Sequence, residues 1–100
     1  MLFRSIRFNG QECGDWYYEL LECTAGGNGF PTPESGYRGL ADFVGDLASQ
    51  AGLVGRLREL DIPQERFETL AADAAKQWTA EFNPRRLHLE DFAQLYSAAY

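Results

Sequence analysis

The sequence lacks both a long apolar run and an excess of positive charge. No stretch of its 100 residues approaches the roughly 18 consecutive apolar residues that a membrane span needs. Arg4 and Arg7 interrupt the N-terminal segment, where a signal peptide needs an unbroken apolar stretch. Lys and Arg number 9 against 15 Asp and Glu, which gives a formal net charge of −6. Nucleic-acid backbones and anionic membrane surfaces select for clustered positive charge, so we expect no nucleic acid and no membrane as a partner.

Cysteine and histidine are also scarce. Cys13 and Cys23 form no Cys-x-x-Cys pattern, and without a secretory signal they are predicted to be reduced thiols of a cytoplasmic protein. His88 is the only histidine, and no Gly-x-Ser-x-Gly elbow accompanies it. A zinc site built from these three residues would lack a fourth ligand. The sequence therefore predicts no catalytic residue, no metal ligand and no cofactor-binding residue in this chain.

Three segments carry apolar residues at the spacing of a helix. The first runs from Thr32, a candidate N-cap followed by Pro33, to Gly52, a candidate C-terminal glycine. Its predicted core face consists of Leu40, Phe43, Val44, Leu47, Ala48 and Ala51.

The second predicted helix opens at Pro63 and is stopped by Asn83-Pro84, because the residue before a proline is pushed out of the α region. Its core face is predicted to comprise Phe67, Leu70, Ala71, Ala74, Ala75 and Trp78. The third helix is predicted to start near His88, with Asp91 in its first turn and Leu87 packed on Phe92. Three such faces joined by short connectors predict an all-α fold, a small helical bundle.

The rest of the chain is less regular. Residues 15–23 are predicted to form a short helix with Trp16, Leu20 and Cys23 on one face, while residues 2–8 fit a strand or a helix equally. Residues 24–36 are rich in glycine and proline and are predicted to be a loop. The length leaves room for one domain over residues 1–100.

Two motifs invite a functional interpretation and are better explained by structure. Gly26-Gly27-Asn28-Gly29 is not followed by Gly-Lys-Ser/Thr, so it fits a turn better than a phosphate-binding loop. Glu90-Asp91 lies in the first turn of a predicted helix, where negative charge complements the helix dipole, so an acid/base pair is the weaker interpretation.

One family resemblance is visible. The stretch 76–85, with its Asn83-Pro84-Arg85 corner, resembles the C-terminal end of the iron-containing alcohol dehydrogenase family, whose last helices commonly end in this corner. The segments 6–9, 51–53, 56–60 and 62–63 also resemble the family, as do Leu87, Glu90, Asp91, Phe92, Leu95, Tyr96, Ala98 and Ala99. Arg86 and His88 depart from it, since the family often has a second proline and a Thr or Ser cap there.

The resemblance implies a fold like the C-terminal helical domain of the dehydroquinate synthase-like, iron-containing alcohol dehydrogenase enzymes. It implies an NAD(P)- and metal-dependent alcohol dehydrogenase or aldehyde reductase as the parent, with divalent iron or zinc. The nucleotide-binding turn and the metal ligands of the family lie upstream of the position matched by Ile6, so this chain is expected to be an inactive C-terminal fragment. Its expected partners are the missing N-terminal part of the parent and, through exposed apolar faces, further copies of itself.

The resemblance also implies a substrate-binding role for two residues. In the family, the turn before the Asn-Pro-Arg corner approaches the cleft between the two domains. Thr79 and Phe82 are the residues of this turn expected to face that cleft. Trp78 belongs to the predicted core face, and Thr79 lies about 100° around the helix from that face.

Two further expectations concern the origin of the chain and an alternative function. Residues 1–5 can be read from a common sequencing-library adapter, so we expect them to be artefactual and the gene to be truncated. The alternative function is a free-standing acidic helical module that binds another protein through its apolar faces. Such a module has no reason to keep the Asn83-Pro84-Arg85 corner in register with a dehydrogenase family.

Overall fold

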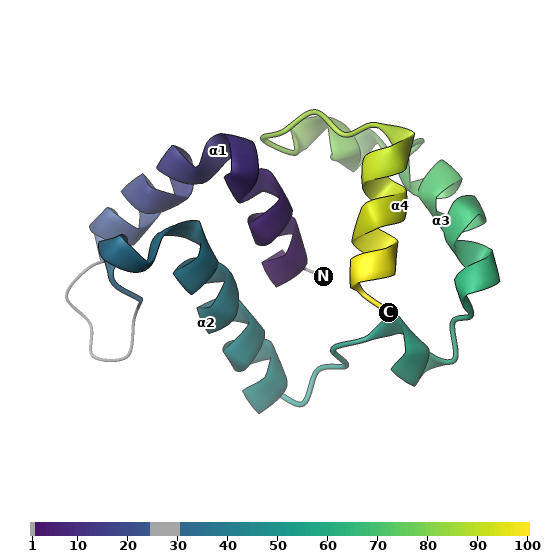
Figure 1. Ribbon diagram of the computed structural model, residues 1–100, viewed down its shortest axis with the longest axis horizontal. Helices are drawn as coiled ribbons and strands as arrows, with labels where there is room; N and C mark the ends of the chain where they lie inside the picture. Colours follow the sequence, from purple (N-terminus) through teal and green to yellow (C-terminus); the bar gives the residue numbers. More distant parts are fainter. Residues whose placement is uncertain (1, 25–30) are drawn as a thin grey trace. The chain divides into compact units, whose positions relative to one another are not determined.

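The computed structural model describes residues 2–24 and 31–100. Within these ranges every regular element is helical and none is a strand, which confirms the predicted all-α class. The chain divides into two compact units, Met1–Leu53 and Val54–Tyr100 (Figure 1). The predicted single domain over residues 1–100 stays a prediction. Residues 25–30 of the predicted loop, including the Gly26–Gly29 motif, lie outside the described residues.

The first unit is a pair of packed helices, α1 (Leu2–Thr24) and α2 (Gly36–Gln50) (Figure 1). The segment that fits strand or helix is helical, and the predicted short helix is the second half of α1. A kink separates the halves at Cys13, whose φ of −113° and ψ of 26° are not helical.

The predicted core face of residues 15–23 is wrong. Trp16 is 62% exposed and Leu20 is exposed as well, whereas Ile6 and Leu21 are buried. The packed stripe of α1 has helical spacing and runs through the buried residues 6, 10 and 21 and the half-buried residues 14 and 17. Two of these positions are glycines, so a search for large apolar side chains does not detect the stripe.

Those two glycines allow α2 to approach α1 closely. The ring of Tyr37, in the first turn of α2, lies directly on Gly10 and Gly14. A Cβ atom at Gly10 would lie 2.1 Å from Tyr37 Cδ2, and one at Gly14 would lie 3.2 Å from Tyr37 Cδ1. Any side chain at position 10 would therefore displace the ring or separate the helices.

The ends of the first predicted helix are partly correct. Pro33–Ser35 form a single 3₁₀ turn, η1, and the chain changes direction at Gly36, the first residue of α2, whose φ is 61°. Thr32 occupies the predicted N-cap position, with Pro33 directly after it, but its side chain makes no cap hydrogen bond. Gly52 is confirmed as the C-terminal glycine, with φ of 72°. The Gly52 and Leu53 amides donate to the carbonyls of Ser49 and Ala48, each at 3.0 Å, which is a Schellman motif.

The packed face of α2 is rotated from the predicted one. Ala41 is fully buried and Tyr37 is half-buried, while Leu47 and Ala51 of the predicted stripe are exposed. The contact of Tyr37 with the glycines of α1 sets this rotation, because it fixes which side of α2 lies against its neighbour.

The second unit consists of α3 (Phe67–Ala74) packed on α4 (Leu89–Ala98), with 3₁₀ turns η2 (Leu57–Leu60), η3 (Gln64–Arg66) and η4 (Trp78–Phe82) (Figure 1). Phe67 is buried, and its ring centroid lies 6.2 Å from that of Tyr96 and 5.8 Å from that of Tyr100. The turn η2 is tied to the end of α4 by the amide of Leu57, which donates to the Ala99 carbonyl at 2.8 Å.

The second predicted helix is shorter than expected. It ends at Ala74, where the amides of Lys76 and Gln77 switch to i−3 carbonyl acceptors, and Gln77 is extended, with ψ of 124°. Because the α-helix ends before Trp78, the Trp78 side chain does not continue the face formed by Phe67 and Ala71. The predicted core role of Trp78 is wrong, since its side chain is 70% exposed.

We predict that Gly10→Ala destabilises the chain by about 1–3 kcal/mol, because the added methyl overpacks the contact with Tyr37. Urea unfolding followed by circular dichroism measures the loss. Gly55→Ala is the matched control: a Cβ at Gly55 meets nothing within 4 Å, so its free energy of unfolding should stay the same or rise slightly. The cost of Gly10→Ala should shrink in a Tyr37→Ala background, and an unchanged cost there would contradict the assignment.

Candidate functional site

The Asn83-Pro84-Arg85 corner joins η4 to α4. Asn83 is extended, with φ of −66° and ψ of 135°, which is the backbone that a following proline demands. Its side-chain Nδ2 donates to the carbonyl of Arg85 at 2.5 Å. The amide thus holds the backbone of the turn, and the corner is built from a steric restriction and one local hydrogen bond.

The corner is also tied to the start of α4. Arg85 Nη2 lies 4.0 Å from Asp91 Oδ1, and both side chains are mostly buried, with 17% and 15% exposed. The second oxygen of the same carboxylate accepts a hydrogen bond from the His88 backbone amide at 2.8 Å. One acidic side chain therefore closes the first turn of α4 and positions Arg85. The predicted helix start near His88 is confirmed.

An open pocket of about 740 Å³ lies beside this corner. Its wall combines apolar groups with charged ones, including Lys76, Trp78, Glu81, Arg86, Leu87 and Phe92. Phe92 is one of the buried residues of the second unit and also lines the pocket, so the pocket reaches from the surface to that unit's core. Such a wall suits the binding of a partly apolar group.

Thr79 and Phe82, the predicted substrate-binding residues, both lie on η4 and are exposed. Phe82 is 75% exposed, and its ring stands edge-on to that of Trp78 with centroids 5.5 Å apart. Thr79 and Phe82 are not among the residues that line the 740 Å³ pocket, whereas Trp78 is. Their substrate role stays a prediction.

Trp78 is the residue of this region that sequence reasoning misassigned. Its spacing from Phe67 and Ala71 fits one continuous helix, and residues 75–77 contain neither glycine nor proline to mark an end. No local signal in the sequence therefore reveals that Trp78 leaves the core and joins the pocket wall.

The corner offers surfaces for binding and no assembled catalytic group. In residues 2–24 and 31–100, no three His, Cys, Asp or Glu side chains come together in a way that could hold a metal ion. His88 is exposed at the start of α4, and Glu90 is exposed in its first turn. What the region presents is a pair of exposed aromatic rings beside a pocket of mixed polarity.

Comparison with known proteins decides the family. The family model of the C-terminal part of the Fe-containing alcohol dehydrogenases matches residues 1–100. The chain belongs to the Fe-containing alcohol dehydrogenase family. The all-helical fold agrees with the C-terminal helical domain of these enzymes. The match includes residues 1–5, where the sequence alone showed no resemblance to the dehydrogenases.

No curated protein matches this Fe-containing alcohol dehydrogenase chain. Among the described residues, no helix combines the length and apolar character that crossing a membrane requires.

The positions of Phe67 and Trp78 predict opposite responses to truncation. Phe67→Ala should cost about 3–5 kcal/mol, because it empties a buried site between Tyr96 and Tyr100. Trp78→Ala should cost less than about 1 kcal/mol, because most of the side chain is already in solvent. Urea unfolding of the two variants measures both values. A loss of several kcal/mol for Trp78→Ala would mean that the ring is part of a core after all.

Proposed function

We propose that this chain is the C-terminal helical part of an NAD(P)- and metal-dependent alcohol dehydrogenase or aldehyde reductase, and that it is inactive by itself. The observation that carries the proposal is the family match over residues 1–100. In this function the corner region forms part of the wall of the substrate cleft, and Thr79 and Phe82 are the residues that face the cleft.

The exposure of the aromatic pair supports a covered position for the corner. Trp78 and Phe82 are large apolar side chains with 70% and 75% of their surface accessible. Burial of apolar area is worth roughly 25 cal/mol per Å², so covering two such rings would favour association by a few kcal/mol. The partner proposed for this surface is the N-terminal part of the same enzyme, which in this family carries the nucleotide and the metal.

The described residues of this chain do not fit a metal site. No cluster of potential metal ligands exists among the described residues, and His88 is the only histidine of the sequence. What the chain's own residues would do is shape the cleft: Thr79 would offer a hydroxyl to the substrate, and Phe82 would exclude water with its ring.

The family match also favours an enzyme part over a free-standing interaction module. Exposed apolar side chains are expected in both cases, so they do not separate the two. The dehydrogenase family pattern, including the Asn83-Pro84-Arg85 corner, is expected only in an enzyme part.

We propose the cytoplasm as the compartment, on the basis of the two cysteines, which form no disulfide in this structure. Copies of the chain alone are proposed to self-associate through the uncovered faces.

We predict that Thr79→Val changes the ratio of kcat/KM between alcohols by about 2–10-fold, the range that one hydroxyl contact supplies. The assay uses an enzyme in which residues 1–100 follow the remaining domains of a family member. The Tm should stay the same, because Thr79 is exposed. Thr69→Val, an exposed threonine of α3, is the matched control and should leave the ratio unchanged. If Thr79→Val left the kcat/KM of every substrate unchanged from the unsubstituted enzyme, Thr79 would not face the cleft. Turnover by the chain alone would refute its inactivity.

We also predict that the rest of the enzyme protects the aromatic pair from oxidation. Hydroxyl-radical footprinting with mass spectrometry compares the chain alone with the same joined enzyme. The oxidation rates of Trp78 and Phe82 should fall several-fold in the joined enzyme. Buried Phe67 should stay unreactive in both, which reports an intact second unit. Unchanged oxidation of Trp78 and Phe82 in an active enzyme would contradict their covered position.

A further inference from the structure

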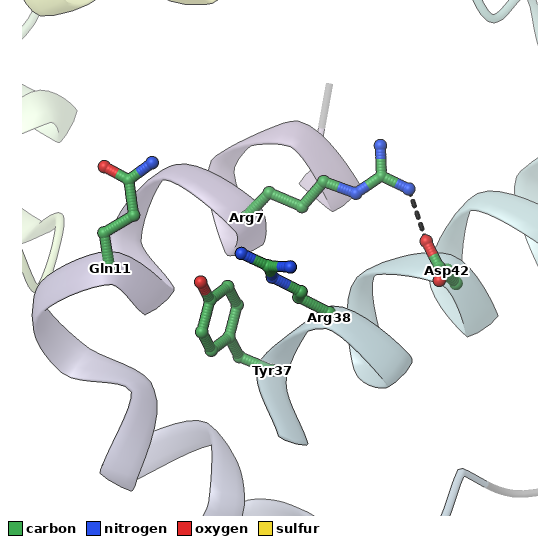
Figure 2. A pocket seen from close by; sticks show the side chains of 5 residues that line it. All are labelled: Arg7, Gln11, Tyr37, Arg38 and Asp42. Carbon is green, nitrogen blue, oxygen red and sulfur yellow. Dashed lines mark hydrogen bonds and ion pairs between the residues drawn. The ribbon is translucent and has the colours of Figure 1, made fainter. Parts of the chain in front are cut away.

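A second pocket lies within the first unit, between α1 and α2, and has a volume of about 410 Å³. Its wall consists of Arg7 and Gln11 from α1 and of Tyr37, Arg38 and Asp42 from α2 (Figure 2). Every one of these side chains ends in a charged or polar group. The pocket is therefore built for polar ligands, unlike the corner region of the second unit.

The charges in this pocket do not cancel. Arg7 reaches from α1 to Asp42, with which it forms an ion pair through Nη2. In Figure 2 the guanidinium of Arg38 lies between the Arg7 side chain and the ring of Tyr37, whose centroid is 5.9 Å from Arg38 Cζ. Two guanidinium groups thus face one carboxylate. A net positive pocket exists in a chain whose total formal charge is −6.

Tyr37 positions the unmatched cation. The neighbouring Tyr37 hydroxyl raises the pKa of the Arg38 guanidinium above its usual value. The same tyrosine is fixed by its ring, which packs on Gly10 and Gly14. Tyr37 lines the pocket, and its O–H can donate to a ligand there. The helix contact therefore also orders two donors at the rim of the pocket.

The fold does not need these cations. Arg7 and Asp42 have 52% and 63% of their side chains exposed, and an ion pair so exposed contributes about 0–1 kcal/mol to stability. The close approach of α1 and α2 rests on Tyr37 and the two glycines. The arrangement of Arg7 and Arg38 thus calls for an explanation other than helix packing.

We propose that this pocket binds one oxyanion group, a phosphate or a carboxylate, of a small molecule. Arg38 is the primary binding group, and the Tyr37 hydroxyl donates beside it. Arg7 contributes a second positive charge, since a guanidinium carries five N–H donors and the bond to Asp42 uses Nη2. Asp42 opposes binding through its charge and limits the ligand to a single anionic group.

The surrounding charges exclude a polyanion. Glu12, Asp15, Glu19 and Glu22 follow on the same helix as Arg7 and Gln11. A nucleic acid or another extended polyanion laid across α1 would meet these carboxylates, whereas a single oxyanion contacts only the positive pocket.

The test is a titration of the 100-residue chain with inorganic phosphate, glycerol 1-phosphate and acetate, each balanced with sodium chloride to constant ionic strength. The Nε–H signals of Arg7 and Arg38 and the amide signals of residues 37–38 are followed by NMR. We expect saturable shifts at these positions with at least one of the three anions. The anion that saturates identifies the source: free phosphate, a phosphomonoester or a carboxylate.

Three variants test the assignment. Arg38→Gln should weaken the binding of that anion at least tenfold, whereas Asp42→Asn should tighten it, because the opposing charge is removed. Arg58→Gln, an exposed arginine of η2, is the matched control and should leave the affinity unchanged. Circular dichroism checks that each variant folds. Shifts that grow linearly with all three anions, equal losses for Arg38→Gln and Arg58→Gln, or weaker binding by Asp42→Asn would each overturn the proposal.

Discussion

The Tyr37 ring packed on Gly10 determines how the first unit is organised. Because a Cβ at position 10 would lie 2.1 Å from that ring, the two helices can approach only where α1 has no side chain. This contact decides which side of each helix is buried and leaves Trp16 and Leu47 in solvent. It also holds the Tyr37 hydroxyl and Arg38 at the rim of the polar pocket. Packing and the proposed oxyanion site therefore depend on the same two residues.

The second unit is organised around a buried aromatic contact and a proline. Phe67 joins α3 to α4 through Tyr96 and Tyr100, while Pro84 forces Asn83 out of helical geometry. Between these fixed points the chain leaves α3 at Ala74 and forms the short turn η4. The turn carries its aromatic side chains outward because no helix remains to direct them toward the core. This is how a segment with a core-like sequence comes to form exposed surface.

The two candidate sites differ in chemistry, and each follows from its own unit. The corner presents aromatic rings beside a pocket of mixed polarity, which suits contact with a partly apolar partner or ligand. The pocket between α1 and α2 presents paired guanidinium groups, which suit an oxyanion. Neither arrangement contains an assembled proton-transfer or metal-binding group among the described residues. Both arrangements are surfaces with the chemistry to bind a ligand or partner, and they belong to a chain of the Fe-containing alcohol dehydrogenase family.

The sequence by itself determined the features that depend on near neighbours in the chain. Gly52 ends α2 because a left-handed residue is cheapest as glycine, and Asn83-Pro84 marks the corner because proline restricts the residue before it. The all-α class followed from apolar spacing in the same way. Tertiary structure alone decided which helix faces are buried. The stripe of α1 contains glycines where a large apolar side chain is expected, and the exposure of Trp78 follows from a helix end without any local breaker. The buried face of α1 and the exposure of Trp78 both depend on which residues pack against these segments in three dimensions. The spacing of apolar residues along the sequence does not contain that information.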